Sequence, residues 1–465
     1  MSAPMRFSLV ENRESGPSEL NCMKNTSFQS DVSRRQFLKS STVVAASAAA
    51  AMSFPSILHA QSKQAFNAAI IGVGGRGSGA GGDFLNAAKI AGVEAKIVAV
   101  ADAFPENANS AVKKFGVPED KCFSGLDAYM KAIEVPGVNY VIIATPPGFK
   151  APQFKAAIAA GKNVFTEKPV AVDGAGCRIM YAAGEEAKQK GLKVAAGTQR
   201  RHKPSYQETV KRIQDGAIGD ISFFRAYWVN GGPIWHRGDK GATTLEKQVR
   251  NWYHYIWLCG DHIVEQHVHD IDVCNWIMND HPIRCWGQGS RQQLGNLSGE
   301  IWDNFDIEFE YANGVRMFSY CGQIQRSWSS VSEHAHGSKG VSSMNDGRNS
   351  ITPKGGEAWK YSGKAPDNGY VNEHVDLINA IVNNTELNEI KNVTDTTLTA
   401  IMGREAAYSG AAVEWDAILN AKFQYGPELL YTDAAKMQWG DFRTLKPPMP
   451  SKHNILDNPP KVVIA

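Results

Sequence analysis

Apolar residues gather in short runs along the first part of the chain. The runs at 66–71, 96–102, 138–145 and 163–166 are rich in Ile, Val and Ala, and helix-like stretches such as 151–160 lie between them. Each run leads into a glycine, a carboxylate or a proline. Continuous apolar strands that alternate with helices predict a parallel, doubly wound sheet.

The pattern changes after residue 196. Residues 221–229, 306–311 and 315–320 alternate apolar and polar side chains, which is typical of strands with one buried face. Residues 312–314, Ala-Asn-Gly, predict a hairpin turn between the last two of these strands. We therefore expect an α/β protein with an N-terminal Rossmann fold and a second domain rich in strands.

The stretch 257–276, WLCGDHIVEQHVHDIDVCNW, combines three histidines with four carboxylates. Val264, Val268 and Ile271 form a helical apolar stripe, and an adjacent polar stripe consists of His262, Glu265, His269 and Asp272. On a helix His267 would point away from His269, because two residues turn by about 200°. We therefore expect no metal site. A metal pair of His262 with Glu265, or a solvated helix face, are the alternatives.

Length and charge restrict the partners. The chain has 465 residues, a formal net charge of +2, 43% hydrophobic residues and 21% charged residues, which is enough for two domains. Near-zero net charge without a long Lys/Arg run argues against a nucleic-acid partner. Six of the seven cysteines follow residue 60 and lack CxxC spacing, so no zinc ribbon is expected, although some could pair in an oxidising compartment.

The N-terminus has the features of an export signal. The stretch SRRQFLK at 33–39 precedes a weakly apolar, Ala-rich segment at 41–52, and this resembles a twin-arginine signal with cleavage near Ala60. We expect a signal peptide at 1–60, a Rossmann domain at 65–190, a substrate and oligomerisation domain at 191–420 and a C-terminal extension at 421–465. The apolar segment is too short to span a membrane. From the twin-arginine signal we expect a protein that is periplasmic or otherwise exported by that route.

A dinucleotide-binding loop follows the first strand. Gly72, Gly74 and Gly77 have the G-x-G-x-x-G spacing, and Asp102 ends the second strand, where a carboxylate would bind a ribose. Because ligands of such sheets lie at the carboxyl ends of the strands, the predicted cofactor-binding residues are Gly72, Gly74, Gly75, Arg76, Gly77, Asp102, Thr145, Pro146, Glu167 and Lys168.

These motifs resemble those of the Gfo/Idh/MocA oxidoreductases. GVGGRG, VAVAD, ATPP, EKP and HDID occur in the family's order, and the resemblance extends over residues 66–416. It implies that the second domain has an open, mostly antiparallel sheet, with the substrate on one face and often an oligomer contact on the other. A homo-oligomer, dimer or tetramer, is therefore expected.

The resemblance also assigns the acid/base residues. The family pattern D-x-G-x-H-x-x-D aligns with Glu265, His267, His269 and Asp272, which makes His269 the acid/base candidate and places Asp272 beside it or beside the substrate. Glu265 and His267 depart from the pattern. Lys168 of EKP is the partner, since a lysine in an apolar site loses its proton easily.

The expected reaction is oxidation of a sugar or glycoside hydroxyl with NAD, whose ribose Asp102 would bind, while Arg76 leaves NADP open. Further substrate candidates are Arg201, His202, Trp252, Tyr255, Glu265 and His267, together with the aromatic residues between 227 and 255 and, at 374, a histidine. Export would require a retained cofactor. An NAD-dependent glycosidase that uses transient oxidation and elimination, and a non-catalytic sugar-binding protein, are the alternatives.

Overall fold

The computed structural model describes residues 65–231 and 234–457, so the twin-arginine stretch lies outside the described residues. The first part of the described chain forms a six-stranded parallel sheet in the order β3-β2-β1-β4-β5-β6. Its strands are β1 (Phe66–Ile71), β2 (Ala95–Asp102), β3 (Cys122–Ser124), β4 (Tyr140–Ile143), β5 (Asn163–Thr166) and β6 (Val194–Ala196). The strand order reverses between β1 and β4, and a ligand site is expected at that point.

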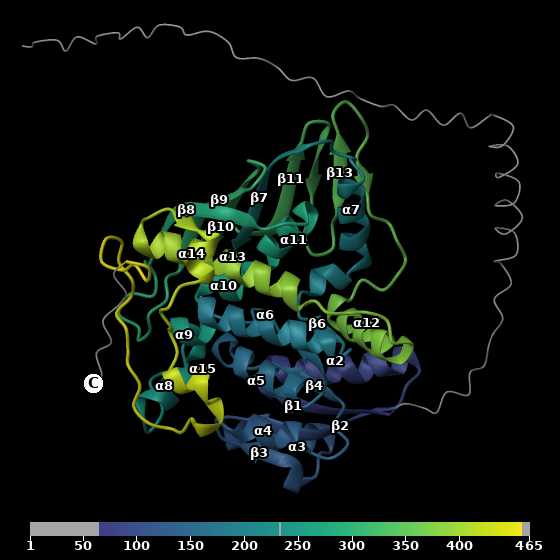
Figure 1. The fold of residues 1–465 in the computed structure, drawn as a ribbon. Helices are drawn as coiled ribbons and strands as arrows, with labels where there is room; N and C mark the ends of the chain where they lie inside the picture. The colour runs from purple at the N-terminus through teal and green to yellow at the C-terminus, as the bar shows by residue number, and fades with distance from the viewer. Residues whose placement is uncertain (1–64, 232–233, 458–465) are drawn as a thin grey trace, which may run out of the picture. The chain divides into compact units, whose positions relative to one another are not determined.

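Helices cover both faces of this sheet (Figure 1). They are α2 (Gly75–Ala91), α3 (Pro105–Phe115), α4 (Ala128–Ile133), α5 (Pro147–Ala159) and α6 (Gly174–Gln189), and α12 (Gly369–Asn383) packs on α2 from late in the chain. Residues 68–71 of β1 are at most 2% exposed, which explains why this strand is apolar on both faces. The doubly wound sheet predicted from the sequence is confirmed.

The second part of the chain forms a nine-stranded sheet in the order β14-β13-β12-β11-β7-β10-β9-β8-β15. Its strands are β7 (Ile221–Val229), β8 (Pro282–Ser290), β9 (Asn304–Tyr311), β10 (Arg316–Gly322), β11 (Ser330–Gly337), β12 (Gly340–Ser343), β13 (Ser350–Pro353), β14 (Trp359–Lys360) and β15 (Val413–Glu414). β7 and β10 pair in parallel, and the other neighbours are antiparallel. The mostly antiparallel sheet is thus confirmed. Gly314, at φ +84°, forms the predicted turn between β9 and β10.

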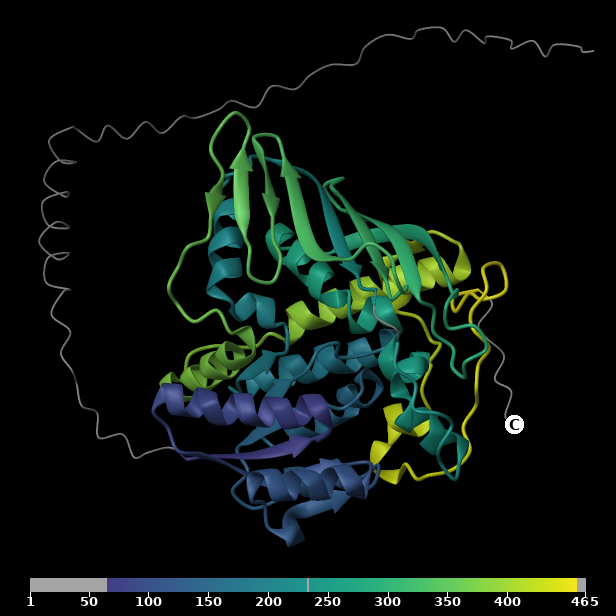
Figure 2. The same ribbon diagram turned by 180° about the vertical axis from the view of Figure 1, so that it is seen from behind.

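One face of the nine-stranded sheet is covered by helices, and the opposite face carries none of the described helices (Figures 1 and 2). The long helix α13 (Ile390–Ser409) lies between the sheet and α6 and contacts β8, β9 and α11. The other helices of this part are α7 (Pro204–Gln214), α8 (Thr244–Arg250), α9 (Ile256–Cys259), α10 (His262–Glu265), α11 (Val268–Met278), α14 (Trp415–Leu419) and α15 (Glu428–Thr432). None of the described helices is long and apolar enough to cross a membrane.

The continuous helix expected from residue 262 onward is wrong. α10 ends at Glu265 and α11 begins at Val268, so Gln266 and His267 interrupt the helix. A helical wheel assumes one apolar and one solvated face. Here the polar residues are buried too, since the exposed fractions of His262, Glu265, His267, His269 and Asp272 are all at most 8%. Their orientations are set by individual partners.

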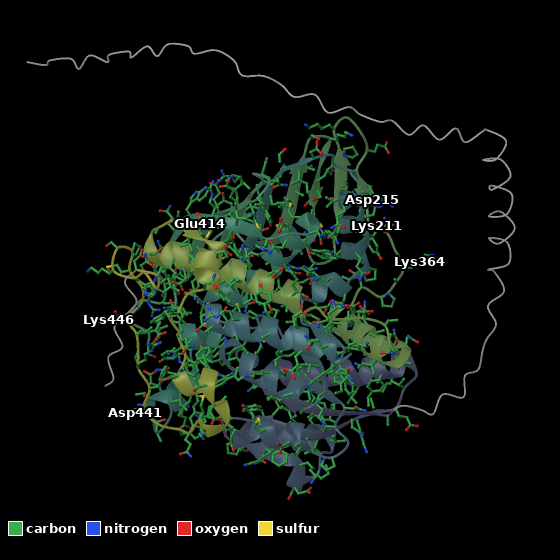
Figure 3. All side chains as sticks on the ribbon, in the orientation of Figure 1. Lys211, Asp215, Lys364, Glu414, Asp441 and Lys446 are labelled. Atoms are coloured by element: carbon green, nitrogen blue, oxygen red, sulfur yellow. The ribbon has the colours of Figure 1, made fainter. Side chains whose placement is uncertain are left out.

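Residues 421–457, called here the C-terminal segment, run back along both parts of the chain (Figure 1). Tyr431 donates a 2.6 Å hydrogen bond from its hydroxyl to Asp173 at the start of α6. At the start of α8, Thr244 donates from its backbone N–H and from its hydroxyl to Asp441, at 3.2 Å each; Figure 3 labels this aspartate. The segment therefore connects α6 of the first sheet with α8, which precedes α10 and α11.

Candidate active site

A cavity of about 500 Å³ lies at the carboxyl ends of β1, β2, β4 and β5 and extends to residues of β7, α8, α10 and α11. This is the size of a typical small-molecule site. The cavity brings together most of the predicted site residues. Those that line it are Gly72, Gly74, Gly75, Arg76, Gly77, Asp102, Thr145, Pro146, Glu167, Lys168, Trp252, Glu265 and His269.

The four glycines of the loop serve three separate purposes. Gly72 has φ +83°, and a Cβ there would lie 2.8 Å from Thr145. A Cβ on Gly77 would lie 1.8 Å from the Gly72 carbonyl oxygen, so only glycine allows α2 to pack on this turn. At Gly74 and Gly75 a Cβ would meet no atom within 4 Å. These two positions are open toward the cavity and leave room for a ligand to approach the backbone.

Asp102 lies beside this loop at the end of β2. One carboxylate oxygen accepts the N–H of Val73 at 2.9 Å, and the other accepts the N–H of Phe104 at 3.0 Å and the side-chain amide of Asn107 at 3.1 Å. Burial raises the pKa of Asp102 above its usual value, although these donors lower it. The carboxylate is thus fixed at the cavity wall and keeps acceptor capacity for a ribose hydroxyl.

Arg76 is engaged by carboxylates. Its guanidinium pairs with Asp83 at 2.9 Å, with Glu373 at 3.2 Å and also with Glu167, and it lies 4.7 Å above the ring of Tyr370. These carboxylates raise the pKa of Arg76 against the opposing effect of burial. A 2′-phosphate would have to displace these anions in order to use Arg76, so the arrangement favours a ligand without that phosphate.

The residues present therefore fit a dinucleotide. Gly74 and Gly75 leave space that a Cβ would fill, and α2 begins there without an acidic residue in its first turn, so its N–H groups and dipole favour an anion such as a pyrophosphate. Asp102 is placed for a ribose. In such a complex these residues would hold the dinucleotide.

Lys168 and Glu265 meet across the cavity. The Lys168 ammonium donates to the Glu265 backbone carbonyl at 2.6 Å and lies 3.5 Å from its carboxylate. Burial raises the pKa of Glu265, while the charges of Lys168 and Lys150 lower it. Because an ammonium has three donors, Lys168 keeps capacity for a ligand oxygen. The residue that replaces the family aspartate is thus the partner of Lys168.

His269 lines the same cavity from the first turn of α11. Its ring stacks on Trp228 at 5.5 Å between centroids. Burial, followed by the charges of Lys168, Arg200 and Arg76, holds the pKa of His269 well below its usual value. The imidazole is therefore neutral near pH 7 and able to accept a proton from a bound hydroxyl.

Asp272 differs from the expectation, because it lies outside the residues that line the cavity. Its carboxylate accepts two hydrogen bonds from the Arg201 guanidinium, at 2.8 and 2.9 Å, and one from the Thr396 hydroxyl at 3.0 Å. Arg201, a predicted substrate residue, is thereby also committed to this buried pair. Neither side chain orients His269.

Other predicted substrate residues also lie away from the cavity lining. His202 contacts Asp376 at 2.6 Å and Glu389, and their charges raise its pKa against burial. His267 is buried against the Ser319 hydroxyl at 2.7 Å, and burial lowers its pKa to about 3. Tyr255 is 4% exposed and belongs to the hydrophobic core. His374, a residue of α12, shares a hydrogen bond with the Tyr140 hydroxyl. Sequence position could not distinguish such buried polar groups from ligand contacts.

Only some of the aromatic residues between 227 and 255 line the cavity. Trp228, Trp235, Trp252 and Tyr253 line the cavity. Tyr227 points to the other face of β7, where it stacks on Tyr320 at 5.4 Å, as the alternation of side chains along a strand requires. His236, which contacts the Ser298 hydroxyl, does not line the cavity.

Several residues that line the cavity were not predicted from the sequence, among them Phe104, Lys150 and Tyr370. Phe104 and Lys150 follow predicted strand ends at 102 and 145, so their positions were signals that could have been used. Tyr370 comes from α12, more than 200 residues later, and no local signal marks it. Within residues 65–231 and 234–457, the six cysteines are free and no group of three metal-ligating residues is placed to hold a metal.

Two family models of known proteins match this chain. Residues 66–197 match the family model described as "Oxidoreductase family, NAD-binding Rossmann fold", and residues 206–343 match the "GFO/IDH/MocA C-terminal domain". The chain belongs to the Gfo/Idh/MocA family. Residues 31–51 match the twin-arginine translocation signal, which indicates export by that route.

Relatives of this Gfo/Idh/MocA protein include scyllo-inositol 2-dehydrogenase (NAD(+)) of Bacillus subtilis, 27% identical over 220 residues, or 47% of this chain and 56% of the relative. Inositol 2-dehydrogenase of Gluconacetobacter diazotrophicus is 29% identical over 45% of this chain and 55% of its own. The chain spans about half the length of the curated relatives it matches. Levoglucosan dehydrogenase with NADH and levoglucosan shares the fold, with a TM-score of 0.62 and 20% identity over 76% of this chain and 99% of its own.

Proposed function

We propose that this protein is an NAD-dependent oxidoreductase that oxidises a hydroxyl-bearing carbon of a sugar, a glycoside or a cyclic polyol. The observation that carries the proposal is that Lys168 and His269 line the same cavity as the glycine loop and Asp102. The relatives named above, which are dehydrogenases of inositols and levoglucosan, support this substrate class.

Two side chains of this protein would act on the substrate hydroxyl. A bound nicotinamide would supply the acceptor for the hydride of the substrate carbon. His269, neutral near pH 7 because of burial and nearby positive charges, accepts the hydroxyl proton. Lys168, already anchored on the Glu265 carbonyl at 2.6 Å, donates to the same oxygen and stabilises its developing negative charge.

The cavity wall supports a carbohydrate ligand. Trp228, Trp235, Trp252 and Tyr253 present rings to the cavity, and flat rings pack on the C–H face of a sugar while their N–H and O–H groups bind hydroxyls. Trp235 is 37% exposed, so part of its ring is free to contact a ligand in the cavity. We place the sugar between these rings and His269.

We further propose that the protein works in the periplasm and retains its cofactor there. Phe104, which lines the cavity two residues after Asp102, stacks on Trp439 of the C-terminal segment at 5.5 Å between centroids. The Arg250 guanidinium lies 4.0 Å from the same ring and pairs with Glu106 at 2.8 Å. These contacts fix the cavity wall beside Asp102, which would slow the dissociation of a bound dinucleotide.

The first test uses the exported protein as purified, without added nucleotide. We expect extraction to yield NAD, and sugars or inositols to produce the absorbance band of reduced nicotinamide. A decay of that band with elimination products would point to a glycosidase cycle. If no carbohydrate in a broad panel changes the spectrum of NAD-loaded protein, the proposed activity is refuted.

Retention is tested by the dissociation rate of NAD. Trp439→Ala should release NAD about tenfold faster, because one of two groups that pack on Phe104 is removed. Leu429→Ala, at a 43% exposed position of the same segment, is the matched control and should change nothing. Equal rates for both variants and the wild type would exclude a role for the segment in retention.

We propose a homo-oligomer that forms through the helix-free face of the nine-stranded sheet. Trp328 is 66% exposed and Tyr320 is 36% exposed, and both contact the ring of Tyr227, which points away from the cavity. Exposed apolar clusters of this kind mark contact surfaces. Trp328→Glu should therefore shift the sedimentation coefficient toward the monomer, whereas Leu297→Glu, at a 44% exposed loop position, should not. A monomeric wild type would contradict the proposal.

A further inference from the structure

Lys150 is a buried lysine for which the proposed reaction has no role. It comes from the first turn of α5, lines the cavity and is 2% exposed. Lysines are almost never fully buried unless they are paired with a carboxylate. Within the described part of the chain, Lys150 forms no such ion pair; its ammonium donates to two backbone carbonyls instead. A buried charge retained in this way needs an explanation.

We propose that Lys150 is a positioning residue, whose ammonium fixes the backbone that presents Lys168 to the substrate. The inference rests on the proposed function, because it assigns Lys168 to the reaction. It extends that function to a residue which does not itself touch the reacting oxygen.

The hydrogen bonds carry this inference. The Lys150 ammonium donates to the carbonyl of Lys168 at 3.1 Å and to the carbonyl of Pro169 at 2.9 Å. Pro169 has no N–H, so it contributes no backbone donor to this turn. On either side of it, Glu167 donates its N–H to Ile143 of β4 at 2.8 Å, and Val170 donates to the Thr397 hydroxyl at 3.3 Å. Lys150 is thus the donor that connects the two carbonyls at the turn to a rigid helix.

Burial and neighbouring charges together set the pKa of Lys150. Burial lowers the pKa of Lys150 to about 8; Glu265 and Glu167 raise it, and the charge of Lys168 lowers it. The charge of Lys150 is thus influenced by two nearby carboxylates and by a second ammonium, although it forms no direct ion pair with them. Loss of the Lys150 charge would weaken both carbonyl contacts, since hydrogen bonds from charged donors are about twice as strong as neutral ones.

Three variants test the inference in the full-length, NAD-loaded protein. Lys150→Met should lower kcat by about 10- to 100-fold, the effect expected when a reacting group is misplaced by about 1 Å. KM and the dissociation rate of NAD should stay within about twofold, because the glycine loop and Asp102 are unchanged. Lys150→Arg, which keeps the charge and the donors, should recover part of kcat. Lys155→Met, at an exposed position of the same helix, is the matched control and should match the wild type.

The pH dependence separates positioning from simple packing. As the pH rises through about 8, Lys150 loses its proton, so kcat of the wild type should fall there. Lys150→Arg should lack this decline, since its guanidinium stays charged. Independently of activity, NMR of lysines carrying ¹³C at Cε should show one group that titrates near pH 8 and disappears in both Lys150 variants.

The outcomes distinguish this inference from the proposed function. A wild type that oxidises no carbohydrate refutes the function. An active wild type whose kcat and pH profile are matched by Lys150→Met overturns the role of Lys150 and leaves the function intact. If Lys150→Met does not fold, Lys150→Arg and the lysine titration decide: an unchanged pH profile in Lys150→Arg, or no lysine titrating near pH 8, overturns the inference.

Discussion

Replacement of Asp272 by asparagine separates a structural role from a catalytic one. The wild-type carboxylate, whose side chain is 2% exposed, accepts two hydrogen bonds from Arg201 and one from Thr396. Asparagine has nearly the same shape but no charge, so the guanidinium of Arg201, whose side chain is only 13% exposed, loses the carboxylate that it contacts directly. Removal of one partner from a buried pair costs about 3 kcal/mol or more of the free energy of unfolding.

This loss converts into a measurable shift in Tm. An unfolding entropy of about 2.1 cal/mol/K per residue, over about 400 residues, amounts to roughly 0.85 kcal/mol/K. A loss of about 3 kcal/mol should therefore lower Tm by about 4 °C, measured by scanning calorimetry on the NAD-loaded protein. The kcat of the folded variant at 25 °C should stay within about twofold of the wild type, because Asp272 does not line the cavity.

Arg201→Gln is the matched variant, since it breaks the same pair from the other side. It should lower Tm by a similar amount, and the double variant should lose less than the sum of the two, as expected for groups in direct contact. A kcat of Asp272→Asn that falls about 100-fold at an unchanged Tm would refute this reasoning and return Asp272 to the acid/base machinery.

Three further predictions concern the cavity and its surroundings. Lys168→Met should lower kcat by about 10²- to 10⁴-fold while NAD still binds; normal turnover would exclude Lys168 as the group that stabilises the negative charge on the substrate oxygen. Gly74→Ala should keep Tm but weaken NAD binding about tenfold, because its Cβ would enter the space left for the ligand. Gly77→Ala should lower Tm, because its Cβ would lie 1.8 Å from a carbonyl oxygen. Calorimetry and NAD titration that show the reverse pattern would contradict these roles. His267 has a pKa of about 3 in the folded state and about 6.5 in the unfolded chain, so acid favours the unfolded state. The free energy of unfolding of the wild type, relative to His267→Gln, should be greatest above pH 6.5 and fall by about 2 kcal/mol on going down to about pH 5. A difference between the two proteins that stays constant with pH in parallel melts would contradict the lowered pKa of His267.

Short sequence motifs were enough to predict the part of the cavity that lies at the ends of the parallel strands. The glycine spacing, the carboxylate at the end of β2 and the residues after β4 and β5 lie within a few residues of apolar strands. Since parallel strands of a doubly wound sheet end at one edge, all ten predicted cofactor residues line one cavity. Periodicity also predicted the alternating strands β7, β9 and β10, because each has one buried face.

Only the tertiary structure shows which residues of the stretch 257–276 line the cavity. Sequence order placed Glu265, His267, His269 and Asp272 on a plausible helix, but partners far along the chain determine where each side chain points. Glu265 meets Lys168, 97 residues away, while Asp272 meets an arginine 71 residues away, outside the cavity. A buried charge takes the orientation in which another group compensates it, and that group can come from any part of the chain.

The sequence by itself determined the two sheets, the export signal and the dinucleotide loop, because each depends on short-range periodicity or on a local backbone requirement for glycine. Only the tertiary structure decided which polar residues face the cavity, that Lys150 donates to the carbonyls of Lys168 and Pro169, and that Trp439 stacks on Phe104. These contacts depend on packing between elements that are remote in sequence, and neither composition nor spacing carries that information.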